Sequence, residues 1–428
     1  MIKEITPVNN LKGELTIPGD KSISHRALLL GALAEGKTEI SGFLPGADCL
    51  STLECLRQMG VMIERPTETN VIIKGSGLNG LKEPSQVLDA GNSGTTARLL
   101  LGILAGQRFF SALTGDFSLR QRPMGRVVEP LKQMGAQISG RQSANLLPLA
   151  VTGKQLHGID YLSPVASAQL KSALLLAGLY AEGPTSVMEP SKSRDHSERM
   201  LQFFGAKLHV DGLKVTVHPG GKMEARKVVV PGDISSAAFF IVAGLIVPNS
   251  ELLIKNVGIN PTRTGLITAL QQMNGQIEVI NRREEVGEPV ADLLIKSSDL
   301  KAATIKGDII PTLIDEVPAL TVAALFAEGE TVIMDAAELR VKESDRIAVL
   351  AEELQKIGGQ VQELPDGLRI RGGRALRGSL CSSHHDHRIA MALAVAGLRT
   401  EGKMQIADFE CTAISYPGFA EDLKRLCS

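Results

Sequence analysis

Positively charged residues occupy several positions where the sequence predicts a helix to begin. Lys21 and Arg26 open one such segment, and Arg122, Arg194 and Arg346 precede others. The first turn of a helix carries a partial positive charge, so a cation there is unfavourable unless an anion lies beside it. Taken alone, each of these residues would usually be a solvated side chain at a loop end. Taken together, these residues predict a binding site for anionic small molecules.

Other groups suited to the same chemistry stand at comparable positions. Hydroxyl, amide and backbone N–H groups donate hydrogen bonds to phosphate and carboxylate oxygens. Three predicted helix starts supply them, through Ser22, Asn92, Ser93, Gly94, Ser167 and Gln169. Two later helix starts combine carboxylates with a cation, through Asp315, Glu316, Asp386 and Arg388. The anion-binding residues therefore fall into two groups along the chain.

Two recurring phrases indicate the elements that must position these residues. The first is Leu-x-x-Met-Gly or a close variant, followed by alternating apolar residues, and it returns at intervals of roughly 70–85 residues. It reads as the end of a helix, a glycine stop and a strand. Its copies begin at Leu56, Leu131, Leu201, Leu270, Leu354 and Leu423.

The second phrase is a helix that is apolar on every face, followed by a glycine stop and a β-branched run. Its six copies span residues 22–36, 92–106, 167–183, 234–248, 315–329 and 386–402. Helices of this kind must be buried, with strands packed around them. The apolar runs are therefore core rather than binding surface.

The two halves of the chain echo each other, because Ile17-Pro18-Gly19-Asp20 and Val230-Pro231-Gly232-Asp233 precede the first and fourth buried helices. We expect an α/β fold of two similar domains with three units each: residues 1–19 with 232–428, and residues 20–231. If the buried helices of a domain run parallel, their N-termini gather at one end, and the cleft between the domains attracts anions. Both halves keep the Pro-Gly-Asp turn, but Ile234 stands in the fourth unit where the first unit has Lys21. The turn therefore has a structural role, whereas Lys21 is not needed to form it.

Composition excludes several classes of protein. The net charge of -1 arises from interspersed acids and bases, which gives no basic tail for nucleic acid. The five cysteines form no CxxC pair and no metal-binding spacing, and the longest apolar stretch is too short to span a bilayer. We expect a cytoplasmic protein with free thiols, no membrane or nucleic-acid partner, and a monomeric state.

Seven segments complete the pattern, in the order PGDKSISHRAL, GNSGTTARLL, RPMGR, SAQLKSALLLAG, IDEVPAL, RVKESDRI and HHDHRIAM. Together they resemble the signature segments of the 5-enolpyruvylshikimate-3-phosphate synthase family of enolpyruvyl transferases. The resemblance implies two domains of three βαβαββ units, an inside-out α/β barrel with six repeats, and an active site between the domains. It also implies the activity: transfer of enolpyruvate from phosphoenolpyruvate to the 5-hydroxyl of shikimate 3-phosphate, in the pathway to chorismate and aromatic amino acids.

The resemblance also implies roles for individual residues. The shikimate 3-phosphate contacts would be Lys21, Ser22, Arg26, Ser167, Ala168, Gln169, Arg194, Asp315 and Lys342. The phosphoenolpyruvate contacts would be Lys21, Asn92, Gly94, Arg122, Gln169, Glu343, Arg346 and Arg388, with Asp386 and His387 as further candidates. The family implies that Asp315 and Lys342 handle the 5-hydroxyl proton, Glu343 the methylene proton, and Lys21 both substrates. The chemistry needs one acid and one base, and no metal, nucleotide or redox cofactor.

One position departs from the family pattern. Many members carry a lysine near the C-terminus, where this chain has Ile414, so the phosphoenolpyruvate pocket has one cation fewer or another residue replaces it. Gly94 lies where bulk would crowd glyphosate, an inhibitor of the family, and its small size favours sensitivity. His384, His385 and His387 lack the spacing of zinc motifs, so we expect no metal site.

Two alternatives remain at this point. The related transferase that acts on UDP-N-acetylglucosamine uses a cysteine on a mobile loop, and the corresponding residues 108–126 contain none. A catalytically inactive relative that only binds anions is the other alternative. The presence of Asp315, Lys342 and Glu343 beside the binding residues argues against it.

Overall fold

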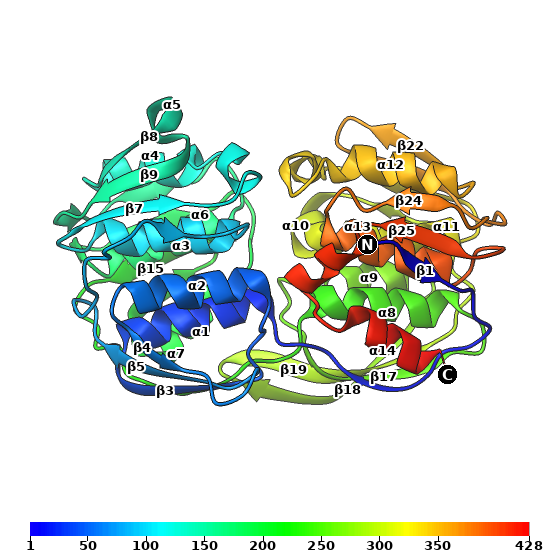
Figure 1. Cartoon of the computed structure of the whole chain (residues 1–428), viewed down its shortest axis with the longest axis horizontal. Coiled ribbons are helices and arrows are strands. Elements are labelled where there is room, and N and C mark those ends of the chain that lie inside the picture. Colours follow the sequence, from blue (N-terminus) through cyan, green and yellow to red (C-terminus); the bar gives the residue numbers. More distant parts are fainter. Residues whose placement is uncertain (428) are drawn as a thin grey trace. The chain divides into compact units, whose positions relative to one another are not determined.

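The computed structural model describes residues 1–427 and divides the chain into two compact units (Figure 1). Unit 1 contains Met1–Pro18, Pro231–Glu284 and the described residues from Pro289 onward. Unit 2 contains Gly19–Val230 and the short segment Glu285–Glu288. Helices and strands are mixed in both units, as the sequence predicts for an α/β protein.

Three helices form the centre of unit 2, where the sequence predicts buried helices. They are α1 (Lys21–Leu33), α3 (Gly94–Ala105) and α6 (Ala168–Gly178). Nearly every residue of each helix is buried, because no face of these helices is polar. A more amphipathic helix follows each of them in the chain: α2 (Ala47–Gln58), α4 (Gly125–Gln133) and α7 (His196–Phe203). The remaining helical turns of unit 2 are η1 (Leu119–Gln121) and α5 (Arg141–Ala144).

The sheets of unit 2 place polar residues outward and apolar residues toward these helices. Three sheets have four strands each, in which a parallel strand joins an antiparallel group. Their strands are β16 (Lys227–Val229), β3 (Glu35–Ser41), β5 (Val71–Ser76) and β4 (Met62–Glu64); β6 (Leu88–Asp89), β7 (Phe110–Thr114), β9 (Leu146–Thr152) and β8 (Gln137–Gly140); and β11 (Asp160–Leu162), β13 (Thr185–Met188), β15 (Lys214–His218) and β14 (Lys207–Asp211). A small parallel pair joins β10 (Leu156–His157) to β12 (Ala181–Glu182).

Unit 1 repeats the same plan around its own three buried helices (Figure 1). These helices contact one another and are α8 (Ile234–Ile246), α11 (Val317–Leu325) and α13 (His387–Gly397). The more amphipathic helices are α9 (Gly265–Gln272), α12 (Arg346–Lys356) and α14 (Phe419–Leu426). Shorter turns are η2 (Gly307–Ile309), α10 (Ile310–Leu313), η3 (Ile314–Glu316), η4 (Ala337–Val341) and η5 (Phe409–Ile414).

Three sheets surround the helices of unit 1. Two have four strands: β18 (Gln276–Glu285), β19 (Glu288–Lys296), β17 (Glu251–Gly258) and β2 (Lys12–Thr16); and β20 (Thr304–Ile305), β21 (Glu330–Ile333), β23 (Gly367–Arg371) and β22 (Gln360–Leu364). The third has three: β1 (Lys3–Ile5), β25 (Met404–Ala407) and β24 (Leu380–Ser382). The N-terminal strands β1 and β2 thus pair within unit 1.

No helix within residues 1–427 combines the length and the apolar character that a bilayer-spanning helix requires. The two units instead bury their apolar side chains in two separate clusters, one for each unit. Each cluster surrounds the three buried helices of its unit, so packing in the core holds the first turns of those helices in position.

A close approach between α3 and α6 predicts a stability effect in unit 2. A Cβ added at Gly102 of α3 would lie 2.2 Å from the backbone oxygen of Ala173 in α6, so Gly102→Ala must push the helices apart. We expect a loss of about 1–3 kcal/mol in the free energy of unfolding, measured by urea denaturation.

Gly31→Ala in α1 is the matched control, because its added Cβ meets only side-chain atoms of Ile73 and Thr38 at 3.1 Å, which can shift. A helix-interior alanine also raises helix propensity, so the control should lose less stability than Gly102→Ala. Equal losses in the two variants would contradict the packing argument.

Candidate active site

The first turn of α1 carries Lys21, the first helical residue, directly after the capping residue Asp20. The Asp20 carboxylate accepts a hydrogen bond from the backbone N–H of Ile23 at 2.8 Å, which satisfies one of the free N–H groups of the helix start. The Lys21 ammonium lies 3.1 Å from a carboxylate oxygen of Asp48 in α2. Asp48 therefore compensates a cation that the helix dipole alone would disfavour.

Arg26 lies one turn further along α1 and is buried among hydroxyl groups. Its Nε donates to Ser197 Oγ at 2.7 Å, and its Nη2 donates to Ser172 Oγ at 2.8 Å. Its Nη1 donates to the backbone oxygen of Ser22 at 3.0 Å. Burial and, to a smaller extent, the positive charge of Arg194 lower the pKa of Arg26 to about 10, against the opposing effect of the Glu198 carboxylate. Arg26 stays charged at neutral pH.

The start of α3 brings Asn92 and Arg122 together. Arg122 Nη2 donates to Asn92 Oδ1 at 2.7 Å and to Ser118 Oγ at 3.1 Å. Asn92 in turn donates through Nδ2 to Asp116 Oδ2 at 2.6 Å. These contacts orient the Arg122 guanidinium beside the first turn of α3, where Gly94 is the first helical residue.

Gly94 has little free space around it. A Cβ at this position would lie 2.7 Å from Nη1 of Arg98, which is a buried side chain one turn further along α3. The same Nη1 donates to Gln169 Oε1 at 2.7 Å. A larger residue at position 94 would therefore displace Arg98 and disturb its contact with Gln169.

The start of α6 presents Ser167, Ala168 and Gln169. Ser167 caps the helix through its hydroxyl, which accepts from the backbone N–H of Leu170. Gln169 accepts from Arg98 and, at 3.3 Å, from Arg126, while its Nε2 donates to Thr95 Oγ1 at 3.1 Å. Gln169 thus joins the start of α6 to the start of α3.

In unit 1, Arg346 is the first residue of α12 and has an exposed side-chain fraction of 1%. Its guanidinium contacts three carboxylates, which are Asp386 at 2.8 Å, Glu343 at 2.6 Å and Asp315 at 3.4 Å. Burial acts to lower the pKa of Arg346, but these carboxylates outweigh burial and raise it above its ordinary value. Arg346 is therefore always charged, and the three carboxylates surround its guanidinium.

Lys342 and Asp315 lie beside this cluster and retain some exposure to solvent. The Lys342 ammonium is 3.6 Å from Asp315 Oδ1 and 2.9 Å from Glu338 Oε1. The exposed side-chain fractions are 21% for Lys342, 14% for Asp315 and 25% for Glu343. These three side chains therefore keep enough exposure to reach a bound molecule.

The start of α13 completes the group. Asp386 caps the helix by accepting from the backbone N–H of Arg388 at 2.9 Å. Arg388 Nη1 donates to the backbone oxygen of Asp315 at 2.7 Å, and His387 between them is buried. Burial acts to raise the pKa of Asp386, but the positive charge of Arg346 outweighs it and lowers the pKa below the ordinary value. Asp386 is therefore ionised at neutral pH.

Each unit thus gathers cations and hydrogen-bond donors at the starts of its buried helices. Arg, Lys and backbone N–H groups bind phosphate and carboxylate, and carboxylates with some exposure beside a lysine can transfer protons.

A family model described as EPSP synthase (3-phosphoshikimate 1-carboxyvinyltransferase) matches residues 5–423. The chain belongs to the EPSP synthase family. The family resemblance that the sequence segments indicate is therefore confirmed.

Relatives of this EPSP synthase family member are similar along their whole length. A protein of Desulforudis audaxviator named 3-phosphoshikimate 1-carboxyvinyltransferase is 58% identical, over 100% of this chain and 99% of the relative. One of the same name from Synechococcus sp. is 59% identical, over 99% and 96%. A solved structure of EPSP synthase from Acinetobacter baumannii has a TM-score of 0.90 and 49% identity, and covers 99% of this chain and 98% of the solved chain.

Within this family member, the predicted site residues divide between the two units. Unit 2 holds Lys21, Ser22, Arg26, Asn92, Gly94, Arg122, Ser167, Ala168, Gln169 and Arg194. Unit 1 holds Asp315, Lys342, Glu343, Arg346, Asp386, His387 and Arg388. Arg194 is two residues before α7, and its charge acts on Arg26. Ile414 ends η5 and packs against the core of unit 1.

Several supporting residues of the site were absent from the sequence prediction. Asp48 pairs with Lys21, Ser172 and Ser197 hold Arg26, and Arg98 holds Gln169. Asp48 and Ser197 lie on ordinary amphipathic helices, where polar residues are expected, so their residue type does not mark them. A buried polar residue inside an apolar helix, such as Arg98 or Ser172, is the one signal that could have identified a supporting residue.

Among the histidines considered for metal binding, His384 has carboxylates nearby. Its Nε2 lies 2.7 Å from Glu353, and Glu352 is close enough to complete a possible ligand group. The Lys356 ammonium already contacts Glu353 at 2.8 Å and Glu352 at 3.0 Å. This ion pairing accounts for the acidic residues, and the expectation of no metal site stays a prediction.

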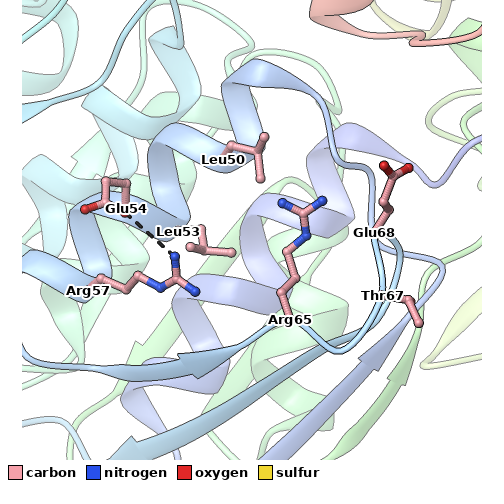
Figure 2. A pocket seen from close by; sticks show the side chains of 7 residues that line it. All are labelled: Leu50, Leu53, Glu54, Arg57, Arg65, Thr67 and Glu68. Atoms are coloured by element: carbon pink, nitrogen blue, oxygen red, sulfur yellow. Dashed lines mark ion pairs between the residues drawn. The ribbon is translucent and has the colours of Figure 1, made fainter.

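A groove of about 540 Å³ lies in unit 2, between α2 and the loop after β4. Figure 2 shows the side chains that line it. Leu50 and Leu53 line it together with charged side chains, of which Glu54 and Arg57 form an ion pair at 3.9 Å. None of the predicted site residues lines this groove. We assign it no part in the chemistry.

The Asp386–Arg346 pair predicts a pH-dependent contribution to stability. Because the pKa of Asp386 is lowered in the folded state, its contribution is present above the unfolded pKa of about 4 and is lost as pH falls through the folded value. Asp386→Asn should lower stability by about 3 kcal/mol at pH 7, and its melting temperature should approach the wild-type value as pH falls below about 4.

Glu330→Gln is the control for this measurement, because Glu330 pairs with Arg369 on the exposed surface at 3.1 Å. A surface pair contributes little, so this variant should follow the wild-type melting temperature from pH 3 to pH 8. A difference between Asp386→Asn and wild type that stays constant with pH would show that Asp386 does not contribute through its charge.

Proposed function

We propose that this chain transfers the enolpyruvyl group of phosphoenolpyruvate to the 5-hydroxyl of shikimate 3-phosphate and releases phosphate. The contact of Arg346 with Asp315, Glu343 and Asp386 is the observation that carries this proposal most directly. It joins the acid–base carboxylates that the chemistry needs to a cation suited to phosphoenolpyruvate. Membership in the EPSP synthase family supports the same reaction.

The reaction has two steps that use the same groups in opposite directions. In the addition, the 5-hydroxyl loses its proton to Asp315, with Lys342 beside it, and its oxygen bonds to C2 of phosphoenolpyruvate. Glu343 protonates C3, which gives a tetrahedral adduct that still carries phosphate. In the elimination, C3 returns its proton to Glu343 and the double bond between C2 and C3 forms again. The bond between C2 and the phosphate oxygen breaks, and the departing phosphate takes the proton from Asp315. Neighbouring cations stabilise the phosphate as it leaves.

The substrate assignments follow charge and residue type. Shikimate 3-phosphate would be bound by Ser22, Arg26, Ser167, Ala168, Gln169 and Arg194, with Lys21, Asp315 and Lys342 around its 5-hydroxyl. Phosphoenolpyruvate would be bound by Lys21, Asn92, Gly94, Arg122, Gln169, Glu343, Arg346 and Arg388, with Asp386 and His387 behind it. Planar guanidinium groups suit carboxylate and phosphate oxygens, and the Lys21 ammonium suits a position between two anions.

These roles require residues of both units, which we propose to be two domains of three units each, residues 1–19 with 232–428 and residues 20–231. The six-repeat, inside-out barrel arrangement belongs to the same proposal. The steps above call for no cofactor, because proton transfer and charge stabilisation suffice. A cytoplasmic location and a monomeric enzyme remain predictions from the sequence.

Phosphate release with different acceptors tests the proposed reaction. Incubation with phosphoenolpyruvate and shikimate 3-phosphate should release one phosphate for each enol ether formed. A colorimetric assay measures the released phosphate, and mass spectrometry measures the enol ether product. Phosphoenolpyruvate alone, or with UDP-N-acetylglucosamine, should release none. Release that depends on UDP-N-acetylglucosamine instead would assign the related transferase activity and exclude the reaction proposed here.

Asp315→Asn separates binding from chemistry. An amide keeps the size of the side chain and one acceptor oxygen but cannot take the hydroxyl proton, so kcat should fall by about 10²–10⁴-fold. The Kd for shikimate 3-phosphate, from isothermal titration calorimetry, should stay within about threefold of wild type, because the phosphate contacts lie elsewhere. Asp308→Asn, an exposed aspartate of the same unit, should leave both values unchanged. Wild-type turnover in Asp315→Asn would exclude Asp315 as the base.

A further inference from the structure

Three charged side chains of unit 2 lie buried behind the proposed phosphate-binding residues and take no part in the proposed chemistry. They are Lys171 on α6, Glu189 after β13 and Glu198 on α7, which we call the buried triad. Their exposed side-chain fractions are 2%, 2% and 5%. The Lys171 ammonium lies 2.7 Å from an oxygen of Glu189 and 2.7 Å from an oxygen of Glu198.

Glu189 holds two separate segments of the proposed shikimate 3-phosphate site. Its Oε1 accepts a hydrogen bond from the backbone N–H of Ser167 at 2.9 Å. Its Oε2 accepts from the hydroxyl of Ser193 at 2.9 Å and from the backbone N–H of Ser193 at 3.4 Å. Ser167 starts α6, and Ser193 immediately precedes Arg194. One carboxylate therefore sets the spacing between the proposed phosphate ligands Ser167 and Arg194.

Lys171 and Glu198 connect the same segments through their helices. Lys171 is next to Ser172 on α6, and Glu198 is next to Ser197 on α7. Ser172 and Ser197 are the hydroxyl groups that accept hydrogen bonds from Arg26. The triad and the Arg26 contacts thus both connect α6 with α7, so a shift of either helix would disturb both sets of contacts.

Electrostatics gives the triad a clear cost and no evident gain in stability. Burial raises the pKa of Glu198, against the opposing charge of Lys171. Burial alone would lower the pKa of Lys171, but the two carboxylates raise it, so Lys171 stays charged. Buried ion groups of this kind are often no more stabilising than apolar residues of similar volume. Apolar residues could supply the same stability, but they could not make the hydrogen bonds that the triad makes to the neighbouring segments.

We propose that Lys171, Glu189 and Glu198 are positioning residues that hold Ser167, Arg194 and Arg26 in the geometry that receives the phosphate group of shikimate 3-phosphate. The inference rests on the proposed function, because it assumes that these three ligands bind that phosphate. Ligands held in advance by a second layer of hydrogen bonds lose less freedom on binding, so their affinity is higher.

Glu189→Gln tests the position of the two segments directly. The amide oxygen can still accept from Ser167, but its NH₂ group then faces the Ser193 donors and the Lys171 ammonium. We expect the KM for shikimate 3-phosphate to rise by about tenfold or more, with the KM for phosphoenolpyruvate within twofold and kcat within about threefold of wild type. A residue that acts only on general stability would not separate the two KM values.

Lys171 supplies a graded test at a second position. Lys171→Met leaves Glu189 and Glu198 without their shared cation and should raise the same KM by at least as much as Glu189→Gln. Lys171→Arg keeps the cation, and a cavity of about 230 Å³ beside Lys171, Glu189 and Glu198 gives the larger guanidinium room. Lys171→Arg should therefore restore the KM for shikimate 3-phosphate to within about threefold of wild type.

Lys214→Met is the matched control, because Lys214 lies in the same unit and pairs with Asp160 at 2.8 Å on the exposed surface. It should leave both KM values unchanged. Circular dichroism and thermal melting establish which variants are folded at the assay temperature.

Equal changes in both KM values, or no change in a folded Glu189→Gln enzyme, would overturn the positioning role. Failure of both Glu189→Gln and Lys171→Met to fold would also overturn it, since the triad would then be purely structural. If the wild-type enzyme itself releases no phosphate with the two substrates, the proposed function fails, which is a separate result.

Discussion

Burying a cation beside the start of a helix is the constraint on which the rest of this structure depends. Desolvation and the helix dipole both oppose such a cation, and both effects strengthen as water is excluded. In the described residues, Lys21 and Arg346 each stand at the first residue of a helix and each contacts a carboxylate. The carboxylates make the burial tolerable, and the cations can then serve an anionic ligand.

The two units meet this constraint with different chemistry. In unit 2, Arg26 donates to the hydroxyl groups of Ser197 and Ser172, and Arg122 donates to the amide oxygen of Asn92. Guanidinium groups held by such neutral acceptors suit a phosphate ligand. In unit 1, three carboxylates surround Arg346, and two of them keep some exposure to solvent. Neutral donors favour binding, and ionised carboxylates near a lysine favour proton transfer. The proposed division between phosphate binding and acid–base chemistry follows from this difference.

Buried carboxylates also fix loops in both units. Glu353 in α12 accepts from the backbone N–H of Ser382 at 3.0 Å and lies 2.7 Å from His384, in the loop that leads to Asp386. Glu189 acts in the same way on the segments around Ser167 and Ser193. In each case a buried carboxylate accepts hydrogen bonds from backbone N–H groups of a segment that carries proposed ligands. Such contacts reduce the freedom of loops that would otherwise be mobile.

The sequence alone predicted the buried helices well, because a helix apolar on every face has only one stable environment. All six are present, and five of them carry at their starts residues that the sequence singled out. Arg122, Arg194, Lys342 and Arg346 stand instead at or just before the starts of amphipathic helices. The ion-pair partners could not be predicted in the same way. Asp48, Glu189 and Glu198 lie 27, 18 and 27 residues from the cations they contact, and that distance along the chain carries no periodic signal.

A crystal structure of the enzyme with shikimate 3-phosphate bound tests the central claim most directly. The account predicts phosphate oxygens within hydrogen-bonding distance of Ser167, Arg194 and Arg26, and the 5-hydroxyl close to Asp315. A phosphate group bound away from Ser167, Arg194 and Arg26, with the two arginines contacting only protein groups, would contradict it.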